Sequence, residues 1–192
     1  MLKTRIGDTE VSFSVGFPAT VALLCACDKT GSAALCLYAA LLHETAHIGM
    51  TCACGFHPRA LCFGAFGMRL ELPPLPYRKM AAVALSGPLC NLLFAGISAA
   101  CQSKIGLVVH LALGGFNLLP LTPLDGGQAL FCLLAPRFGE QAAEKTVTLL
   151  TFAAGIPLLA AGVFVLAVTG YNLSLLLLCV YLVFLLFLQK KD

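Results

Sequence analysis

Long apolar runs with few charges among them most strongly limit what this chain can fold into. Of its 192 residues, 59% are hydrophobic and only 11% are charged, and the mean hydropathy is +0.93. Soluble globular domains carry about 25% charged residues. The composition therefore excludes an ordinary soluble protein and predicts an integral membrane protein whose surroundings include a lipid bilayer.

Six apolar runs approach the roughly 20 residues that a helix needs to cross the hydrocarbon core of a bilayer. They cover residues 11–27, 32–50, 80–101, 105–134, 147–168 and 173–188. The fourth run is too long for one straight helix, and Gly114, Gly115, Pro120 and Pro123 within it favour a broken helix. We therefore expect an all-α polytopic fold with six transmembrane helices, the fourth one broken, in a single domain over residues 1–192.

The twelve Lys and Arg residues predict the orientation of these spans. With the N-terminus inside, ten of them lie on that side, and only Lys29 and Lys104 lie on the other. Because basic loops remain in the cytoplasm, both termini are expected there. Topology thus explains the positive charge, and no nucleic-acid partner is expected. A cleavable signal peptide is an alternative for the first run, but Asp8 and Glu10 do not suit its basic start.

One polar motif, His-Glu-Thr-Ala-His at residues 43–47, interrupts the second apolar run. Residues four apart share a face of a helix, so His43 and His47 can bind one metal ion with Glu44 beside it as a general base. Of the nine acidic residues, only Glu44 and Asp125 lie within the predicted spans, and no Lys or Arg does. A mid-membrane charge costs roughly 2.5–3.5 kcal/mol. A divalent cation would compensate both carboxylates.

Asp125 is the predicted third ligand, since a catalytic zinc typically has three protein ligands and an open position. It lies about as far from the inner end of its run as His43 does from the end of its own, so the two can reach a similar depth. The alternative is that Asp-Gly-Gly at 125–127 is a plain loop turn. His57 and His110 are weaker ligand candidates, and we expect both to be structural.

Three motifs in this order resemble the site-2 protease family of intramembrane zinc metalloproteases. They are His-Glu-x-x-His at 43–47, Gly-Pro-Leu-Cys-Asn at 87–91, and Asn-x-x-Pro-x-x-Pro-Leu-Asp-Gly-Gly at 117–127. The resemblance implies one Zn²⁺ per chain, held by His43, His47 and Asp125.

The same resemblance assigns roles to four further residues. Glu44 would be the catalytic base, and Asn117 would lie near the metal and help to hold the substrate. Gly87 and Asn91 would contribute to packing or shaping the core.

Hydrolysis of peptide bonds in membrane-embedded or membrane-associated protein substrates is the function that the resemblance implies. The layout is most similar to the sporulation-type branch, whose known members process an inactive sigma-factor precursor. It implies a bacterial cell membrane and an active site toward the cytoplasmic side. We expect neither PDZ domains nor a C-terminal nucleotide-sensing domain in this chain, and the regulator is not predicted. A membrane metal-ion carrier using the same two histidines and aspartate is the alternative.

A short segment after the second run has the period-two pattern of a strand. Phe66, Met68, Leu70 and Leu72 alternate with glycine and charged residues. We expect a short membrane-associated β segment here, whose edge could pair with an extended substrate. A simple amphipathic connector is the alternative.

Overall fold

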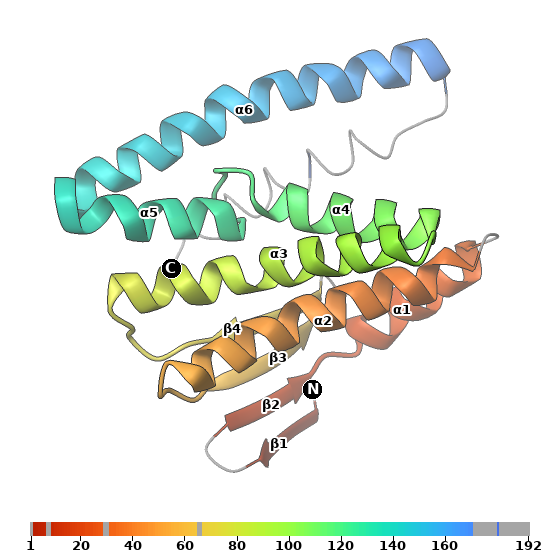
Figure 1. Cartoon of the computed structure of the whole chain (residues 1–192). Coiled ribbons are helices and arrows are strands. Elements are labelled where there is room, and N and C mark those ends of the chain that lie inside the picture. The colour runs from red at the N-terminus through yellow and green to blue at the C-terminus, as the bar shows by residue number, and fades with distance from the viewer. Residues whose placement is uncertain (1, 7–8, 29–30, 65–66, 171–179, 181–192) are drawn as a thin grey trace. The chain divides into compact units, whose positions relative to one another are not determined.

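The computed structural model describes residues 2–6, 9–28, 31–64, 67–170 and 180 of the chain (Figure 1). They form two compact units, Met1–Phe116 and Asn117–Asp192. The first unit contains, in chain order, β1 (Leu2–Ile6), β2 (Thr9–Phe13), α1 (Gly16–Cys27), α2 (Ser32–Ala53), β3 (Ala60–Gly64), β4 (Gly67–Glu71), α3 (Tyr77–Ala100) and all but the last residue of α4 (Lys104–Asn117). The second unit contains α5 (Asp125–Phe138) and α6 (Glu140–Thr169).

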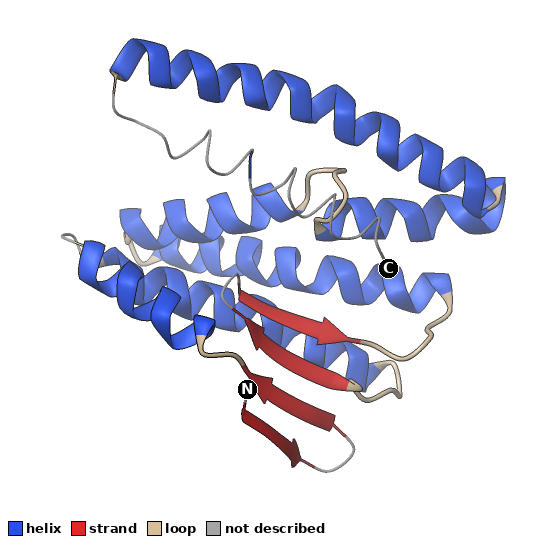
Figure 2. Ribbon diagram, turned by 180° about the vertical axis from the view of Figure 1, so that it is seen from behind, coloured by secondary structure: helices blue, strands red, loops and turns tan. Residues whose placement is uncertain are grey.

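A mixed four-stranded sheet in the order β1-β2-β3-β4 forms one part of the first unit (Figure 2). The outer pairs are antiparallel, whereas β2 and β3 are parallel, because α1 and α2 connect them. Directly paired residues share a face of a sheet. One face carries Val11, Leu61 and Leu70 in one row, and on it the ring of Phe63 stacks against Phe13 and meets Phe17 of α1 edge to face.

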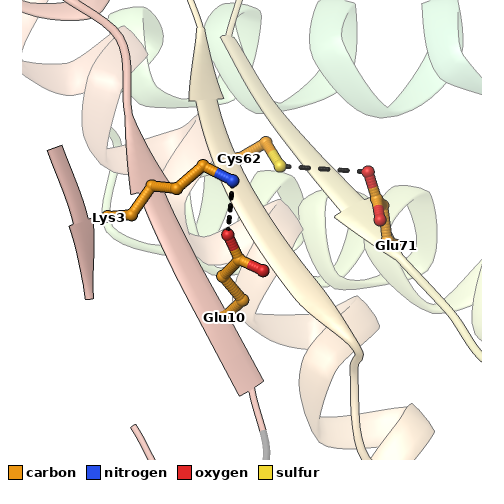
Figure 3. A network of polar contacts seen from close by, with 4 residues as sticks. All are labelled: Lys3, Glu10, Cys62 and Glu71. Atoms are coloured by element: carbon orange, nitrogen blue, oxygen red, sulfur yellow. Dashed lines mark hydrogen bonds and ion pairs between the residues drawn. The ribbon is translucent and has the colours of Figure 1, made fainter. Parts of the chain in front are cut away.

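The opposite face of the sheet is polar, and Figure 3 shows four of its residues. Lys3 on β1 donates a hydrogen bond to Glu10 on β2 at 2.7 Å, and the thiol of Cys62 lies 4.0 Å from a carboxylate oxygen of Glu71. The register places Lys3, Ser12, Cys62 and Arg69 in one row across the four strands. The sheet is therefore amphipathic, with an apolar face toward α1 and a charged face away from it.

Helix α2 begins and ends with recognisable caps. A carboxylate oxygen of Asp28 accepts the Ala33 backbone N–H at 2.7 Å, which satisfies one of the donors left open at a helix start. The chain leaves the helix at Gly55, whose φ of +84° is readily adopted only without a side chain. The helix packs along α3, and both helices carry small buried side chains, among them Ala39 on α2 and Ala81 and Ala84 on α3. This close pairing forms the core of the first unit.

The expected all-α fold is wrong, because four strands precede or interrupt the helices. The predicted first span, residues 11–27, begins within β2 and contributes a helix of only 12 residues. The alternating segment after α2 does form a strand, β4, but it is the edge of a four-stranded sheet. The sequence pattern failed here because the apolar face of a sheet and an apolar helix both read as hydrophobic runs.

The expected six transmembrane helices are also not supported. Within the described part of the chain, two helices, α3 and α6, are long and apolar enough to cross a membrane by length and composition. Helix α2 has 22 residues, but its His-Glu-Thr-Ala-His motif lowers the mean hydropathy of every window long enough to span. The fourth run, residues 105–134, is divided between α4 and α5, each of 14 residues. The sixth run, 173–188, lies outside the described residues apart from Val180.

The Lys3–Glu10 ion pair gives a pH-dependent test of the sheet. The hydrogen bond and opposite charge of Glu10 raise the pKa of Lys3, and those of Lys3 lower the pKa of Glu10. A carboxyl group whose pKa is lowered in the folded protein stabilises the fold fully above the usual carboxyl pKa of about 4.3, and this stabilisation is lost as the pH falls through the lowered pKa. Glu10→Gln should therefore slightly lower the thermal midpoint at a pH of about 7. The difference in thermal midpoint between the two proteins should vanish at a pH well below the lowered pKa of Glu10, where its carboxyl group is protonated.

Thermal unfolding of wild type and Glu10→Gln at both pH values measures this. Because both side chains are exposed, the effect should be small and should shrink further in concentrated salt. A difference that persisted unchanged in acid would show that Glu10 acts through packing and not through its charge.

Candidate metal centre

Helix α2 brings His43 and His47 together on its buried face. The two Nε2 atoms lie 3.1 Å apart, and the ring planes are 85° from each other. The side chains are only 6% and 7% exposed. Two nitrogens bound to one tetrahedral zinc ion, each about 2.0–2.1 Å from it, lie about 3.3 Å apart. The observed separation is close to that of two ligands of one metal ion.

The partner of His47 fixes which of its nitrogens can bind a metal. Its Nδ1 lies 2.7 Å from the backbone carbonyl oxygen of Val83 on α3, and the Ser86 hydroxyl is 3.4 Å from the same nitrogen. A carbonyl only accepts, so Nδ1 carries the proton and Nε2 keeps its lone pair. A metal-binding histidine is usually oriented in this way through its second nitrogen.

Gly87 on α3 keeps the space beside the two imidazoles open. A Cβ atom at this position would lie 2.7 Å from Cε1 of His47 and 2.8 Å from Cε1 of His43, closer than real Cβ contacts. The cradle would thus be filled by any larger residue. This space beside the two buried imidazoles, with the carboxylate residue Glu44 next to His43 in the sequence, fits a divalent ion such as zinc.

Glu44 follows His43 directly on α2 and is half-buried. A residue adjacent to a ligand is rotated by about 100° around a helix, so the carboxylate projects beside the pair of imidazoles and not between them. Its place suits a proton acceptor next to a metal site.

The second unit holds Asp125 at the first position of α5, half-buried. The backbone turns tightly before it: the Leu124 N–H donates to the Leu121 carbonyl at 2.7 Å. Cβ atoms at Gly126 and Gly127 would collide with backbone atoms of Leu118 and Leu121, respectively. The two glycines are therefore required for the turn that precedes Asp125, and the carboxylate is favoured at the positive end of the helix dipole.

Within the second unit, Thr151 ties this turn to α6. Its buried hydroxyl accepts the Thr122 N–H at 3.0 Å and donates to the Val147 carbonyl at 2.8 Å. Asn117 stands at the other end of the turn, as the last residue of α4. The sequence analysis did not identify Thr151, because a threonine in an apolar helix carries no signal of its partner.

The two weaker ligand candidates, His57 and His110, differ in their burial and in their partners. His57 is exposed in the connection after α2, with Nδ1 4.0 Å from the thiol of Cys52. His110 is 2% exposed, and its Nδ1 lies 3.1 Å from the side-chain oxygen of Asn91. In turn, the side-chain nitrogen of Asn91 lies 3.0 Å from Nδ1 of His43. Asn91 therefore does more than shape the core, since it contacts a candidate ligand.

Comparison with known proteins supports the fold. No protein-family model matches the chain, and no curated protein matches it. Among solved structures, it is similar to the site-2 protease from Methanocaldococcus jannaschii, with a TM-score of 0.70 and 18% sequence identity over 95% of this chain and 92% of that one. At this identity the likeness shows that the chain has the fold of a site-2 protease.

Gly87→Ala tests the cradle. The added methyl group would occupy the space beside both imidazoles, so we expect zinc content to fall from about one per chain to near zero. Gly96→Ala is the matched control, because it lies on the same helix and a Cβ there meets nothing within 4 Å. Metal analysis of the purified variants measures the effect. Full zinc loading of Gly87→Ala would place the metal elsewhere.

Thr151→Val tests the anchoring of the turn before Asp125. Without the hydroxyl, the Thr122 N–H loses its acceptor, which should lower the free energy of unfolding by about 1–3 kcal/mol. Thr146→Val on the same helix is the control, because its exposed hydroxyl bonds only to the Ala142 carbonyl of its own helix. Denaturant titration in detergent compares the two. Equal effects would mean that Thr151 does not hold the turn.

Proposed function

We propose that this protein is an intramembrane zinc metalloprotease that hydrolyses peptide bonds in membrane-embedded or membrane-associated proteins. The observation that carries the proposal is the facing pair of His43 and His47 Nε2 atoms, 3.1 Å apart and next to Glu44. The fold is that of a site-2 protease, which agrees with this chemistry.

The proposed ligands of one zinc ion per chain are His43 and His47 on α2 and Asp125 at the start of α5. Two imidazoles and one carboxylate leave a position open for water or substrate, as catalytic zinc sites do. A bound zinc ion would supply the Lewis acidity that polarises a water molecule and the scissile carbonyl.

Glu44 is proposed to move the proton in this reaction. Its carboxylate takes the proton of the attacking water and then delivers it to the leaving amine, as a general base followed by a general acid. Asn117, whose side chain can both donate and accept hydrogen bonds, is proposed to hold the substrate near the scissile bond.

The substrate is proposed to bind as an extended chain along β4. In the described part of the chain, β4 forms one edge of the sheet, and an edge strand offers unpaired backbone groups to a further strand. A helical substrate must unwind before a protease can reach its carbonyl. Pairing with an edge strand would stabilise the unwound form.

A membrane location is part of the proposal and is supported by the length and apolarity of α3 and α6. The distribution of Lys and Arg favours cytoplasmic termini and an active site toward the cytoplasmic side. Processing of an inactive sigma-factor precursor in a bacterial cell membrane is a finer proposal, supported only by the resemblance to the sporulation-type branch.

Glu44→Gln tests the reaction. We expect cleavage of membrane-associated precursor proteins to fall by about a hundredfold or more, while zinc stays near one per chain, because the general base is lost and the ligands remain. Glu144→Gln on α6 is the control for loss of a glutamate, and we expect it to keep both cleavage and zinc.

Two other outcomes would contradict the proposal. If the wild type cut no precursor and exchanged its metal freely, with Glu44→Gln unchanged, a metal-ion carrier would explain the site better. If Glu144→Gln lost cleavage to the same extent as Glu44→Gln, the loss would not be specific to a base at residue 44.

A further inference from the structure

A buried polar chain crosses three helices of the first unit and ends on a candidate zinc ligand. It runs from His110 on α4 through Asn91 on α3 to His43 on α2, with separations of 3.1 Å and 3.0 Å. The three side chains are 2%, 0% and 6% exposed. Buried polar side chains of this kind cost free energy unless they are hydrogen-bonded. The position of each of the three side chains therefore constrains the position of the next.

The packing around His110 holds its ring in place. Phe94, on α3, stacks on the imidazole with ring centroids 5.5 Å apart and planes 25° from parallel. One turn further along α4, a Cβ at Gly114 would lie 3.0 Å from the Pro88 carbonyl oxygen and 3.1 Å from Cβ of Asn91. The glycine lets α4 approach α3 closely enough for His110 to reach Asn91.

The chemistry of a metal ligand sets the direction of these hydrogen bonds. If His43 binds the ion through Nε2, its Nδ1 must carry the proton and donate it. Asn91 can accept it only by turning its amide so that the oxygen faces His43. The NH₂ group then faces His110, whose Nδ1 must accept and whose proton must lie on Nε2. Amide oxygen and nitrogen are nearly equal in size, so this arrangement uses the same positions.

We propose that Asn91 and His110 are positioning residues, which fix the His43 imidazole so that Nε2 faces the metal. This inference rests on the proposed zinc site. Nδ1 of His47 faces a backbone carbonyl, whereas Nδ1 of His43 faces the side chain of Asn91. His110 therefore tunes metal affinity although it is not a ligand.

The test measures Zn²⁺ and Co²⁺ dissociation constants and the Co²⁺ absorption spectrum of the purified full chain in detergent. Asn91→Leu should weaken metal binding by about 10–100-fold, as expected for loss of a group that orients a ligand, and should change the Co²⁺ spectrum. Asn91→Asp keeps an acceptor for Nδ1–H and should bind within a few-fold of the wild type.

His110 is tested by two matched changes. His110→Phe keeps a flat ring against Phe94 but removes the acceptor, so affinity should fall. His110→Gln offers an amide oxygen in its place and should restore much of the affinity. The double variant Asn91→Leu/His110→Phe should bind the metal no more weakly than Asn91→Leu, since the effects of substitutions within one hydrogen-bonded network are not additive.

Thr51→Val is the control for disturbing the buried core, because its hydroxyl bonds to the backbone carbonyl of His47 and not to an imidazole nitrogen. It should leave metal affinity unchanged. If Asn91→Leu does not fold, the comparison of His110→Phe with His110→Gln decides. Wild-type affinity in His110→Phe, or independent effects of Asn91 and His110, would overturn the inference alone. A wild type that bound neither metal would overturn the zinc site and this inference together.

Discussion

The close approach of α2 and α3 at Gly87 is the constraint on which the first unit depends. Small side chains along both helices allow the approach, and Gly87 converts it into a hollow beside the two imidazoles. The same approach brings the Val83 carbonyl to within 2.7 Å of His47 Nδ1. One packing arrangement therefore creates a space beside the imidazoles, orients the candidate ligand His47 and fixes which of its ring nitrogens carries the proton.

In the second unit, the backbone turn before α5 positions Asp125. A turn rich in backbone contacts precedes α5, and Gly126 and Gly127 are the residues that allow it. Thr151 then anchors the turn to α6 through a single buried hydroxyl. Asp125 is thus held at a helix start by local backbone geometry.

The hydrophobic runs alone led to a wrong prediction of an all-α fold with six transmembrane helices. The period-two pattern at Val11 and Phe13 belongs to a strand of an amphipathic sheet, although it merges in the sequence with the apolar helix that follows. The run from residue 105 to 134 was long enough to suggest one interrupted span, but its glycines and prolines separate two helices. Run length measures hydrophobicity and not the period or the partner of a segment.

The sequence by itself determined the local chemistry of this protein. The four-residue spacing of His43 and His47 places both on one face of a helix, whatever surrounds it, and the glycines and prolines between residues 105 and 134 indicate that this run is not one straight helix. Only the tertiary structure decided that Val83 contacts His47, that Asn91 contacts both His43 and His110, and that a sheet accompanies the helices. Helical spacing follows from the backbone itself, whereas a contact between residues 48 positions apart, such as His43 and Asn91, depends on how whole helices pack.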